Sequence, residues 1–213
     1  MPVRKIPKNY RNLTGVIPSD KSVGSAEFES SLERDVLIYF EFDSSVKSFE
    51  VQPVQIEWID ESNKLRTYTP DVLVYFNDRN PIVYEIKYTE DLSEILLEDK
   101  TKFKAAIKFA RSKGWRFKFF TENKIGLTYL KNVRFLLPFL KAGPRSETDM
   151  DLIDGQLNEL SNTSPKQLIS SIFSDEFNQA DLIPTLWYLV ATDQVGIDLN
   201  EPLTMVSKIW SIR

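Results

Sequence analysis

Two carboxylates and one ammonium group lie close together in the sequence, at the ends of two β-rich runs. The run 68–76 contains Asp71, and after a short polar break the run 82–87 contains Glu85 and Lys87. Side chains alternate along a strand, so Glu85 and Lys87 should project from one face of the second run. Burying such charges without partners costs on the order of several kcal/mol. A divalent metal ion held by Asp71 and Glu85 would offset this cost, and the spacing therefore predicts metal-assisted phosphate chemistry.

The composition limits which chemistry the chain can perform. Its 213 residues include no Cys and no His, which excludes disulfides, thiolate zinc sites, Cys or His nucleophiles and imidazole bases. Carboxylates, Lys and hydroxyl groups remain, and oxygen ligands favour Mg²⁺ or Mn²⁺ as the cofactor. No apolar run reaches membrane-spanning length, and residues 1–8 lack the hydrophobic core of a signal peptide. We therefore expect a cytoplasmic bacterial protein with no membrane partner.

Charge and turn residues divide the chain into three parts. Residues 1–24 are a basic arm with five basic residues and one acid. A second boundary falls near Gly143, because Gly-Pro ends any helix there. Lys and Arg number 23 against 20 Asp and Glu in residues 1–143, but 4 against 11 in residues 144–213. We predict one domain over 25–143 and a smaller acidic domain over 144–213.

The hydrophobic pattern of the first domain predicts a mixed sheet with helices beside it. Period-2 alternation indicates strands, and apolar residues at helical spacing indicate helices. Ser25 suits the start of the first helix, since acids follow it closely. The expected elements are a helix over 26–41, strands over 47–59, 65–76 and 81–88, a helix over 100–113, a strand over 116–121 and a helical stretch through 140.

The second domain is expected to hold helices followed by a small hairpin. Helices are predicted over 166–173 and 178–192, and short apolar runs follow over 196–199 and 203–210. This order resembles a winged helix, a shape that often binds DNA. The segment is strongly acidic, however, and a surface that meets phosphates should be basic. We therefore predict a protein-docking domain.

The charged residues of the two runs match the pattern of PD-(D/E)xK nucleases. This pattern also includes an acidic residue on a helix that precedes the two runs. Asp71 and Glu85 would hold Mg²⁺, Lys87 would position water or stabilise developing charge, and Glu33 would complete the metal shell. Taken alone, Glu-x-Lys is more often a solvated cross-strand pair, and Pro-Asp is more often a turn. The apolar runs around both acids and the basic helix that follows them favour the nuclease.

Two groups of basic residues are candidates for contact with double-stranded DNA. The helix over 100–113 presents a basic row, and the N-terminal arm is basic as a whole. A solvated face is the usual role of such a row, and a solvated arm is an equally good interpretation of the other group. The candidate DNA-binding residues are Arg4, Lys5, Lys8, Arg11, Lys21, Lys100, Lys104, Lys108 and Arg111.

Beyond the nuclease pattern, the whole chain resembles TnsA, the endonuclease subunit of heteromeric transposases of the Tn-seven-like type. The block Glu-Ser-x-Leu-Glu-Arg-Asp around Glu33 is the most telling, because unrelated nucleases share the catalytic acids but not this helix. The blocks that carry the resemblance are 15–21, 28–35, 40–43, 49–53, 68–71, 85–87, 121–125 and 130–136.

The resemblance implies a restriction-endonuclease-like fold and a set of site residues. Glu33, Asp71, Glu85 and Lys87 would be catalytic, with the three acids as metal ligands, and Gln52 would support them. It further implies cleavage at the 5′ ends of the transposon, beside a TnsB-type DDE transposase that cuts the 3′ ends. The C-terminal domain would contact a TnsC-type AAA+ ATPase.

Two other functions remain open from the sequence. The same fold serves stand-alone restriction and repair nucleases, which cut DNA without partner subunits. A non-catalytic DNA or protein adaptor could also keep the fold. Metal binding by Asp71 and Glu85 would distinguish either nuclease from the adaptor.

Overall fold

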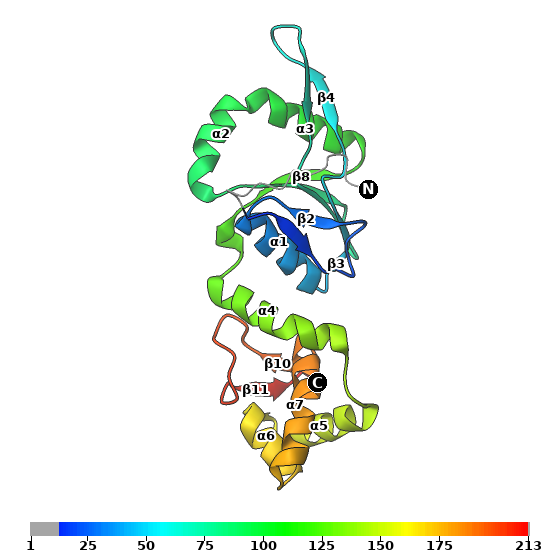
Figure 1. The fold of residues 1–213 in the computed structure, drawn as a ribbon, viewed down its shortest axis with the longest axis vertical. Helices are drawn as coiled ribbons and strands as arrows, with labels where there is room; N and C mark the ends of the chain where they lie inside the picture. The colour runs from blue at the N-terminus through cyan, green and yellow to red at the C-terminus, as the bar shows by residue number, and fades with distance from the viewer. Residues whose placement is uncertain (1–12, 213) are drawn as a thin grey trace. The chain divides into compact units, whose positions relative to one another are not determined.

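The computed structural model describes residues 13–212 of the chain. The chain separates into two compact units, with the division between Ile125 and Gly126 (Figure 1). The candidate DNA-binding residues Arg4, Lys5, Lys8 and Arg11 lie outside the described residues. In the described part, none of the helices is both long and apolar enough to cross a membrane.

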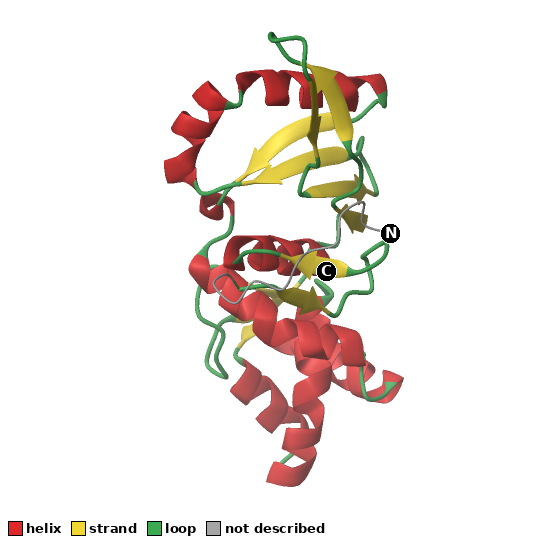
Figure 2. Ribbon diagram, turned by 45° about the horizontal axis from the view of Figure 1, so that its top comes forward, coloured by secondary structure: helices red, strands yellow, loops and turns green. Residues whose placement is uncertain are grey.

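The first unit has a mixed α/β architecture, with helices beside its sheet (Figure 2). Short helical turns, η1 and η2, accompany the regular helices and strands. Its elements are β1 (Gly15–Ile17), β2 (Ala26–Phe28), α1 (Ser31–Phe42), β3 (Val46–Val51), β4 (Ile56–Ile59), β5 (Leu65–Tyr68), β6 (Val72–Phe76), β7 (Ile82–Ile86), η1 (Thr89–Asp91), α2 (Leu92–Glu98), α3 (Lys100–Ser112), β8 (Arg116–Phe120) and η2 (Glu122–Lys124).

A mixed sheet forms the centre of this unit, with its described strands in the order β3-β6-β7-β8. β3 pairs antiparallel with β6, and β6 pairs antiparallel with β7. β8 pairs parallel with β7, so that Glu85 lies opposite Phe119. The parallel pair requires a crossover, which α2 and α3 provide.

Helices cover the two faces of the sheet. On one face, the ring of Phe40 from α1 packs against Tyr84 and Phe120, with ring centroids 5.5 and 5.4 Å apart. On the other face, Phe103 of α3 packs against Phe119 at 4.9 Å. Ala110 of the same helix joins a buried cluster with strand residues of this face. Alternation along β7 therefore turns Tyr84 toward α1 and Glu85 toward the α3 side.

The expected helix over 26–41 is wrong in its first part. Ala26 and Phe28 are buried with Glu27 between them, which is strand alternation, and the segment pairs antiparallel with β1. The helix begins only at Ser31. Its N-cap is Ser30, whose side chain accepts a hydrogen bond from the backbone N–H of Glu33, so the expected cap at Ser25 is also wrong.

Two expected long strands, which pair with each other, are each interrupted near the middle. The run 47–59 divides into β3 and β4, and the run 65–76 divides into β5 and β6. β4 and β5 pair with each other as a separate two-stranded ribbon. Pro53 and Pro70 occupy the two interruptions, and proline has no N–H to give to a strand ladder. The breaks release Asp71 from the ribbon and place it at the start of β6.

The second unit packs helices against a small antiparallel sheet. α4 packs on α7, and the described strands follow the order β10-β11-β9. Gly196 pairs with Trp210, whose ring leaves no room for a Cβ at that position. The elements are α4 (Leu127–Ala142), α5 (Glu147–Leu160), β9 (Asn162–Thr163), α6 (Pro165–Ile172), α7 (Glu176–Ala191), β10 (Val195–Ile197) and β11 (Ile209–Ser211).

The division between the units differs from the boundary expected near Gly143. The positive φ of 73° at Gly143 does end α4, but α4 as a whole lies with the second unit. The reason is packing. Asn132 of α4 is buried and its side chain binds the main chain at Leu199, Glu201 and Leu203. Including α4, residues 126–213 carry 7 Lys and Arg against 11 Asp and Glu.

Candidate active site

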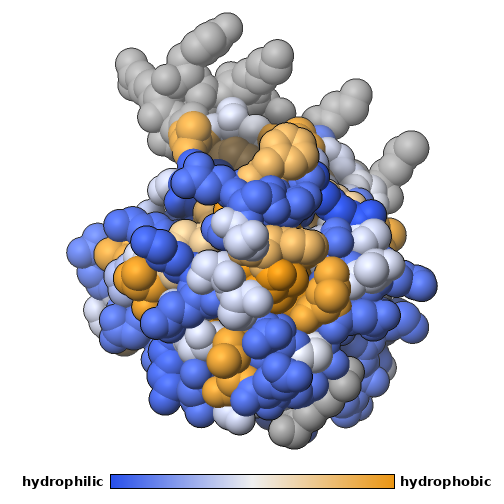
Figure 3. Space-filling model, turned by 90° about the horizontal axis from the view of Figure 1, so that it is seen from below, coloured by the Kyte–Doolittle hydropathy of each residue, from blue (hydrophilic) through white to orange (hydrophobic). Residues whose placement is uncertain are grey.

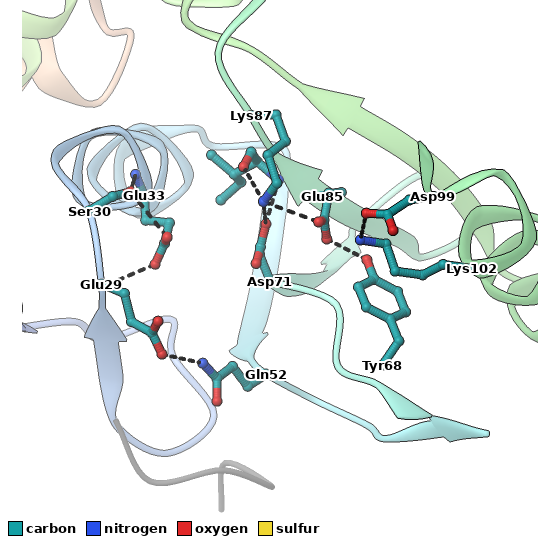
Figure 4. A network of polar contacts seen from close by, with 11 residues as sticks. Glu29, Ser30, Glu33, Gln52, Tyr68, Asp71, Glu85, Lys87, Asp99 and Lys102 are labelled. Carbon is teal, nitrogen blue, oxygen red and sulfur yellow. Dashed lines mark hydrogen bonds and ion pairs between the residues drawn. The ribbon is translucent and has the colours of Figure 1, made fainter. Parts of the chain in front are cut away.

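Asp71, Glu85 and Lys87 come together where β6 begins and β7 ends (Figure 4). The ammonium Nζ of Lys87 lies 3.1 Å from Oε1 of Glu85 and 3.7 Å from Oδ2 of Asp71. It also donates to the main-chain oxygen of Ile86 at 3.1 Å. The antiparallel pairing of the two strands creates this arrangement, because it brings the first residue of one beside the last of the other.

The main chain holds Asp71 in place from two sides. Its Oδ2 accepts a hydrogen bond from the backbone N–H of Ile86 at 2.6 Å. Its carbonyl oxygen accepts from the backbone N–H of Gln52 at 2.9 Å. The side chain of Asp71 is therefore fixed across the end of the sheet, close to Lys87.

Burial of the like charges shifts the protonation of the site. Burial first, and then the neighbouring charge of Glu85, raise the pKa of Asp71 above its usual range. Burial lowers the pKa of Lys87, but the carboxylates of Asp71 and Glu85 outweigh it, so the pKa is raised overall. Lys87 therefore stays charged at neutral pH. Clusters of groups whose pKa values are shifted are typical of functional sites.

The Glu85 carboxylate is buried, with 4% of its side chain exposed. Its Oε2 accepts a hydrogen bond from the hydroxyl of Tyr68, the last residue of β5. Its Oε1 faces Lys87. Burial and the charge of Glu85 raise the pKa of the Tyr68 hydroxyl, so the phenol keeps its proton and acts as a donor.

Glu33 lies near this cluster but has another local role. Its Oε1 accepts from the hydroxyl of Ser30 at 3.0 Å and its Oε2 accepts from the backbone N–H of Glu29 at 2.8 Å. With the cap at Ser30, these bonds form a variant of the capping box, in which Glu33 accepts from the residue before the cap. Burial raises the pKa of Glu33, and the hydrogen bonds from Glu29 and Ser30 and the charge of Lys87 act against this shift.

Gln52 connects the start of α1 with the start of β6. Its side-chain Nε2 donates to Glu29 at 3.3 Å, while its backbone N–H binds Asp71. Its φ of 48° is in the left-handed region, which is uncommon for a residue other than glycine. Its Oε1 is buried and has no hydrogen-bond partner in the structure. The supporting role expected for Gln52 stays a prediction. Its left-handed φ and its unpaired Oε1 are the observations that favour this role.

The donor atoms of this site fit a hard divalent cation. Asp71 and Glu85 offer only oxygen, the ligand type of Mg²⁺ and Mn²⁺, and the ammonium of Lys87 already lies between them. In the described part of the chain, Oδ1 of Asp71 accepts no hydrogen bond and is available to a ligand. Within residues 13–212, no group of three or more carboxylates is placed to hold one metal ion. Glu33 is therefore not gathered with the other two acids.

The structure separates the candidate DNA-binding residues that it describes. Lys100, Lys104, Lys108 and Arg111 are all exposed on α3. Lys21 is only partly exposed, and its ammonium donates to the main-chain oxygen of Asp43 at 2.6 Å. The ammonium of Lys21 is therefore engaged within the protein, and its contact with DNA stays a prediction.

Tyr68 is the neighbour of the site that the sequence analysis missed. It stands in the block 68–71 beside Asp71, so its place in the sequence was a usable signal. What the sequence could not give was the direction of its hydroxyl, which depends on where β5 ends.

Two family models match the chain. The model described as TnsA-like endonuclease N terminal matches residues 43–122, and the model described as TnsA endonuclease C terminal matches residues 125–199. The first match contains Asp71, Glu85 and Lys87, whereas Glu33 precedes it. The second match begins where the structure divides the chain. No curated protein matches the chain.

Proposed function

Because the chain belongs to the TnsA-like endonuclease family, we propose that it is the metal-dependent DNA endonuclease subunit of a Tn7-like transposase. In this role it cuts the 5′ ends of the transposon during cut-and-paste transposition. The observation that carries the proposal is the cluster of Asp71, Glu85 and Lys87 at the end of the sheet.

Each residue of the cluster has a distinct role in this proposal. Asp71 and Glu85 would hold a Mg²⁺ or Mn²⁺ ion, whereas both oxygens of Glu33 accept hydrogen bonds at the start of α1. When bound, such an ion polarises the scissile phosphate and lowers the pKa of a bound water. Lys87 keeps its proton because of the carboxylates beside it. Its ammonium then stabilises the negative charge that develops on the phosphate.

The exposed row on α3 is proposed to contact the DNA backbone. Lys100, Lys104, Lys108 and Arg111 are exposed along one helix, and α3 packs on the sheet face toward which Glu85 turns. Basic side chains that neutralise phosphates supply most of the affinity that does not depend on sequence. This arrangement supports the binding of double-stranded transposon ends near the cluster.

The second unit is proposed to be a winged-helix-like docking domain. Helix α5, strand β9, helices α6 and α7, and strands β10 and β11 follow one another in the order typical of a winged helix. Its net charge is negative, which favours a protein partner over DNA. Figure 3 shows one largely hydrophilic face with a group of apolar residues near its middle. We propose that the protein partner of this acidic domain is a TnsC-type AAA+ ATPase.

Strand-specific cleavage in a reconstituted reaction tests the proposed function. The purified chain, a TnsB-type DDE transposase and a TnsC-type ATPase are combined with labelled transposon-end DNA and Mg²⁺. We expect Lys87→Ala to slow the 5′-strand cut by about 100-fold or more, since loss of one group that stabilises the transition state has effects of this size. The 3′-strand cut by the partner should continue and reports that the complex has assembled.

The matched control is Lys47→Ala, which removes an exposed lysine of β3. It should cleave both strands normally. A normal rate of 5′ cleavage by Lys87→Ala would overturn the proposal. Cleavage by the purified chain without its partners would favour a stand-alone nuclease.

A further inference from the structure

We propose that Tyr68 is a positioning residue that aims the Glu85 carboxylate at the reacting centre. The inference rests on the proposed function, since it assigns a role within the same site. Tyr68 does not touch the DNA or the metal in this account. It acts through Glu85, whose orientation it fixes.

The two oxygens of Glu85 have different partners, and this fixes how the carboxylate is turned. Oε2 accepts from the Tyr68 hydroxyl, while Oε1 lies 3.1 Å from Nζ of Lys87. Only 4% of the Glu85 side chain is exposed, so water cannot easily replace the phenol as a donor. With Oε2 occupied, Oε1 is the oxygen turned toward Lys87 and Asp71. A carboxylate without the phenol would lose this distinction between its oxygens.

Residues of helix α3 hold the phenol ring of Tyr68 in place. The ring packs edge-on against Phe103, with centroids 6.3 Å apart and an interplanar angle of 85°. The ammonium of Lys102 lies 5.3 Å from the centre of the Tyr68 ring, and the same ammonium forms an ion pair with Asp99. An aromatic ring, a cation and the end of β5 therefore fix Tyr68. Figure 4 shows Lys102 and Asp99 beside Tyr68. A donor held in this way is suited to orient a ligand rather than to exchange partners.

The test compares Tyr68→Phe with Tyr84→Phe in the full chain. Tyr84 is a matched control, because it lies next to Glu85 on β7 and packs on the opposite face against Phe40. In the described residues its hydroxyl makes no hydrogen bond. Each substitution removes one hydroxyl and keeps the ring. Mn²⁺ affinity is measured by electron paramagnetic resonance, and 5′-strand cleavage gives kcat and the KM for DNA.

We expect Tyr68→Phe to weaken Mn²⁺ binding by about 10-fold or more, the usual effect of removing a group that orients a metal ligand. kcat should fall, while the KM for DNA should stay unchanged. Tyr84→Phe should bind Mn²⁺ as the unaltered chain does. Should Tyr68→Phe reduce the folded fraction, Lys102→Met gives a second measurement. It keeps the phenol but removes the cation over its ring, and we expect a loss of Mn²⁺ affinity of about 2- to 5-fold.

The outcomes separate this inference from the proposed function. Equal Mn²⁺ affinity in the unaltered chain and Tyr68→Phe overturns the role of Tyr68 and leaves the metal site intact. Equal losses in Tyr68→Phe and Tyr84→Phe also overturn it, because the effect would then be general. An unaltered chain that binds no Mn²⁺ overturns the metal site itself, and the role of Tyr68 with it.

Discussion

Glu41 and Glu85 are both buried carboxylates of the first unit, 4% and 3% exposed, but their surroundings differ. Glu41 lies near the end of α1 and accepts from the backbone N–H groups of Asp20 at 2.9 Å and Lys21 at 3.4 Å. The hydroxyl of Ser19 donates to it as well. In the described residues, the Glu85 carboxylate has only side-chain partners, Tyr68 and Lys87.

Burial alone therefore does not distinguish the two carboxylates, whereas their hydrogen-bond partners do. Glu41 connects the loop after β1 to α1 by accepting hydrogen bonds from main-chain N–H groups. These hydrogen bonds cannot break unless the loop unfolds. Glu85 shares a cation with Asp71, whose pKa is raised by burial and then by Glu85. Two like charges around one cation can exchange that cation for another, and this is what a metal site requires.

The largest expected effect is on catalysis, in Asp71→Asn. The substitution keeps the shape of the side chain but removes one of the two charges that face Lys87. We expect 5′-strand cleavage to fall by about 100-fold or more. The free energy of unfolding of the metal-free protein should stay the same or rise, because the repulsion between the like charges of Asp71 and Glu85 is lost. Normal cleavage together with a large loss of stability would assign Asp71 to the same structural class as Glu41.

The next effect is on stability, in Glu41→Gln. One amide oxygen replaces two carboxylate oxygens, so at least one donor of the loop loses its acceptor. We expect the free energy of unfolding to fall by about 1–3 kcal/mol, the cost of a buried group without a partner. Denaturation in urea measures it, and the folded fraction should cleave at the normal rate. Lost cleavage at unchanged stability would contradict the comparison.

The smallest effect is a pH dependence of stability in the metal-free protein. A carboxyl whose pKa is raised by folding binds more protons in the folded state than in the unfolded state. Stability therefore falls as the pH rises from about 4, the unfolded value for Asp, through the raised pKa of Asp71. Glu33, whose pKa is also raised, adds to this slope.

Urea denaturation at a series of pH values in the presence of a chelator measures this slope. Asp71→Asn should reduce it, whereas Glu41→Gln should leave it unchanged. Added Mg²⁺ should oppose the loss of stability, because the metal ion competes with protons for the carboxylate. An identical slope in the unaltered chain and Asp71→Asn would show that Asp71 does not titrate with a raised pKa.

The sequence predicted much of the first unit for identifiable reasons. Strand alternation placed Glu85 and Lys87 on one face of the run 82–87, and the structure brings both to Asp71. The basic row of α3 follows from helical spacing, and its side chains are exposed. The mixed sheet with flanking helices also follows from the order of the elements.

The cap of α1, helix α5 and the contact of Tyr68 were not predicted from the sequence. Both Ser25 and Ser30 can cap a helix, and only the capping box with Glu33 favours Ser30. Helix α5 was missed although its sequence carries a signal, since Met150, Ile153, Leu157 and Leu160 follow helical spacing and Ser146 is its N-cap. The hydroxyl of Tyr68 meets Glu85 at the point where β5 ends, next to the interruption that contains Pro70.

The most direct test of the central claim is a crystal structure of the chain grown with Mn²⁺ and measured at a wavelength where manganese scatters anomalously. We predict one anomalous peak contacted by the carboxylates of Asp71 and Glu85, with Lys87 displaced from between them. No peak should appear at Glu41. A structure in which Lys87 keeps its ion pairs with both acids, and manganese is absent from this place at saturating concentration, would contradict the account.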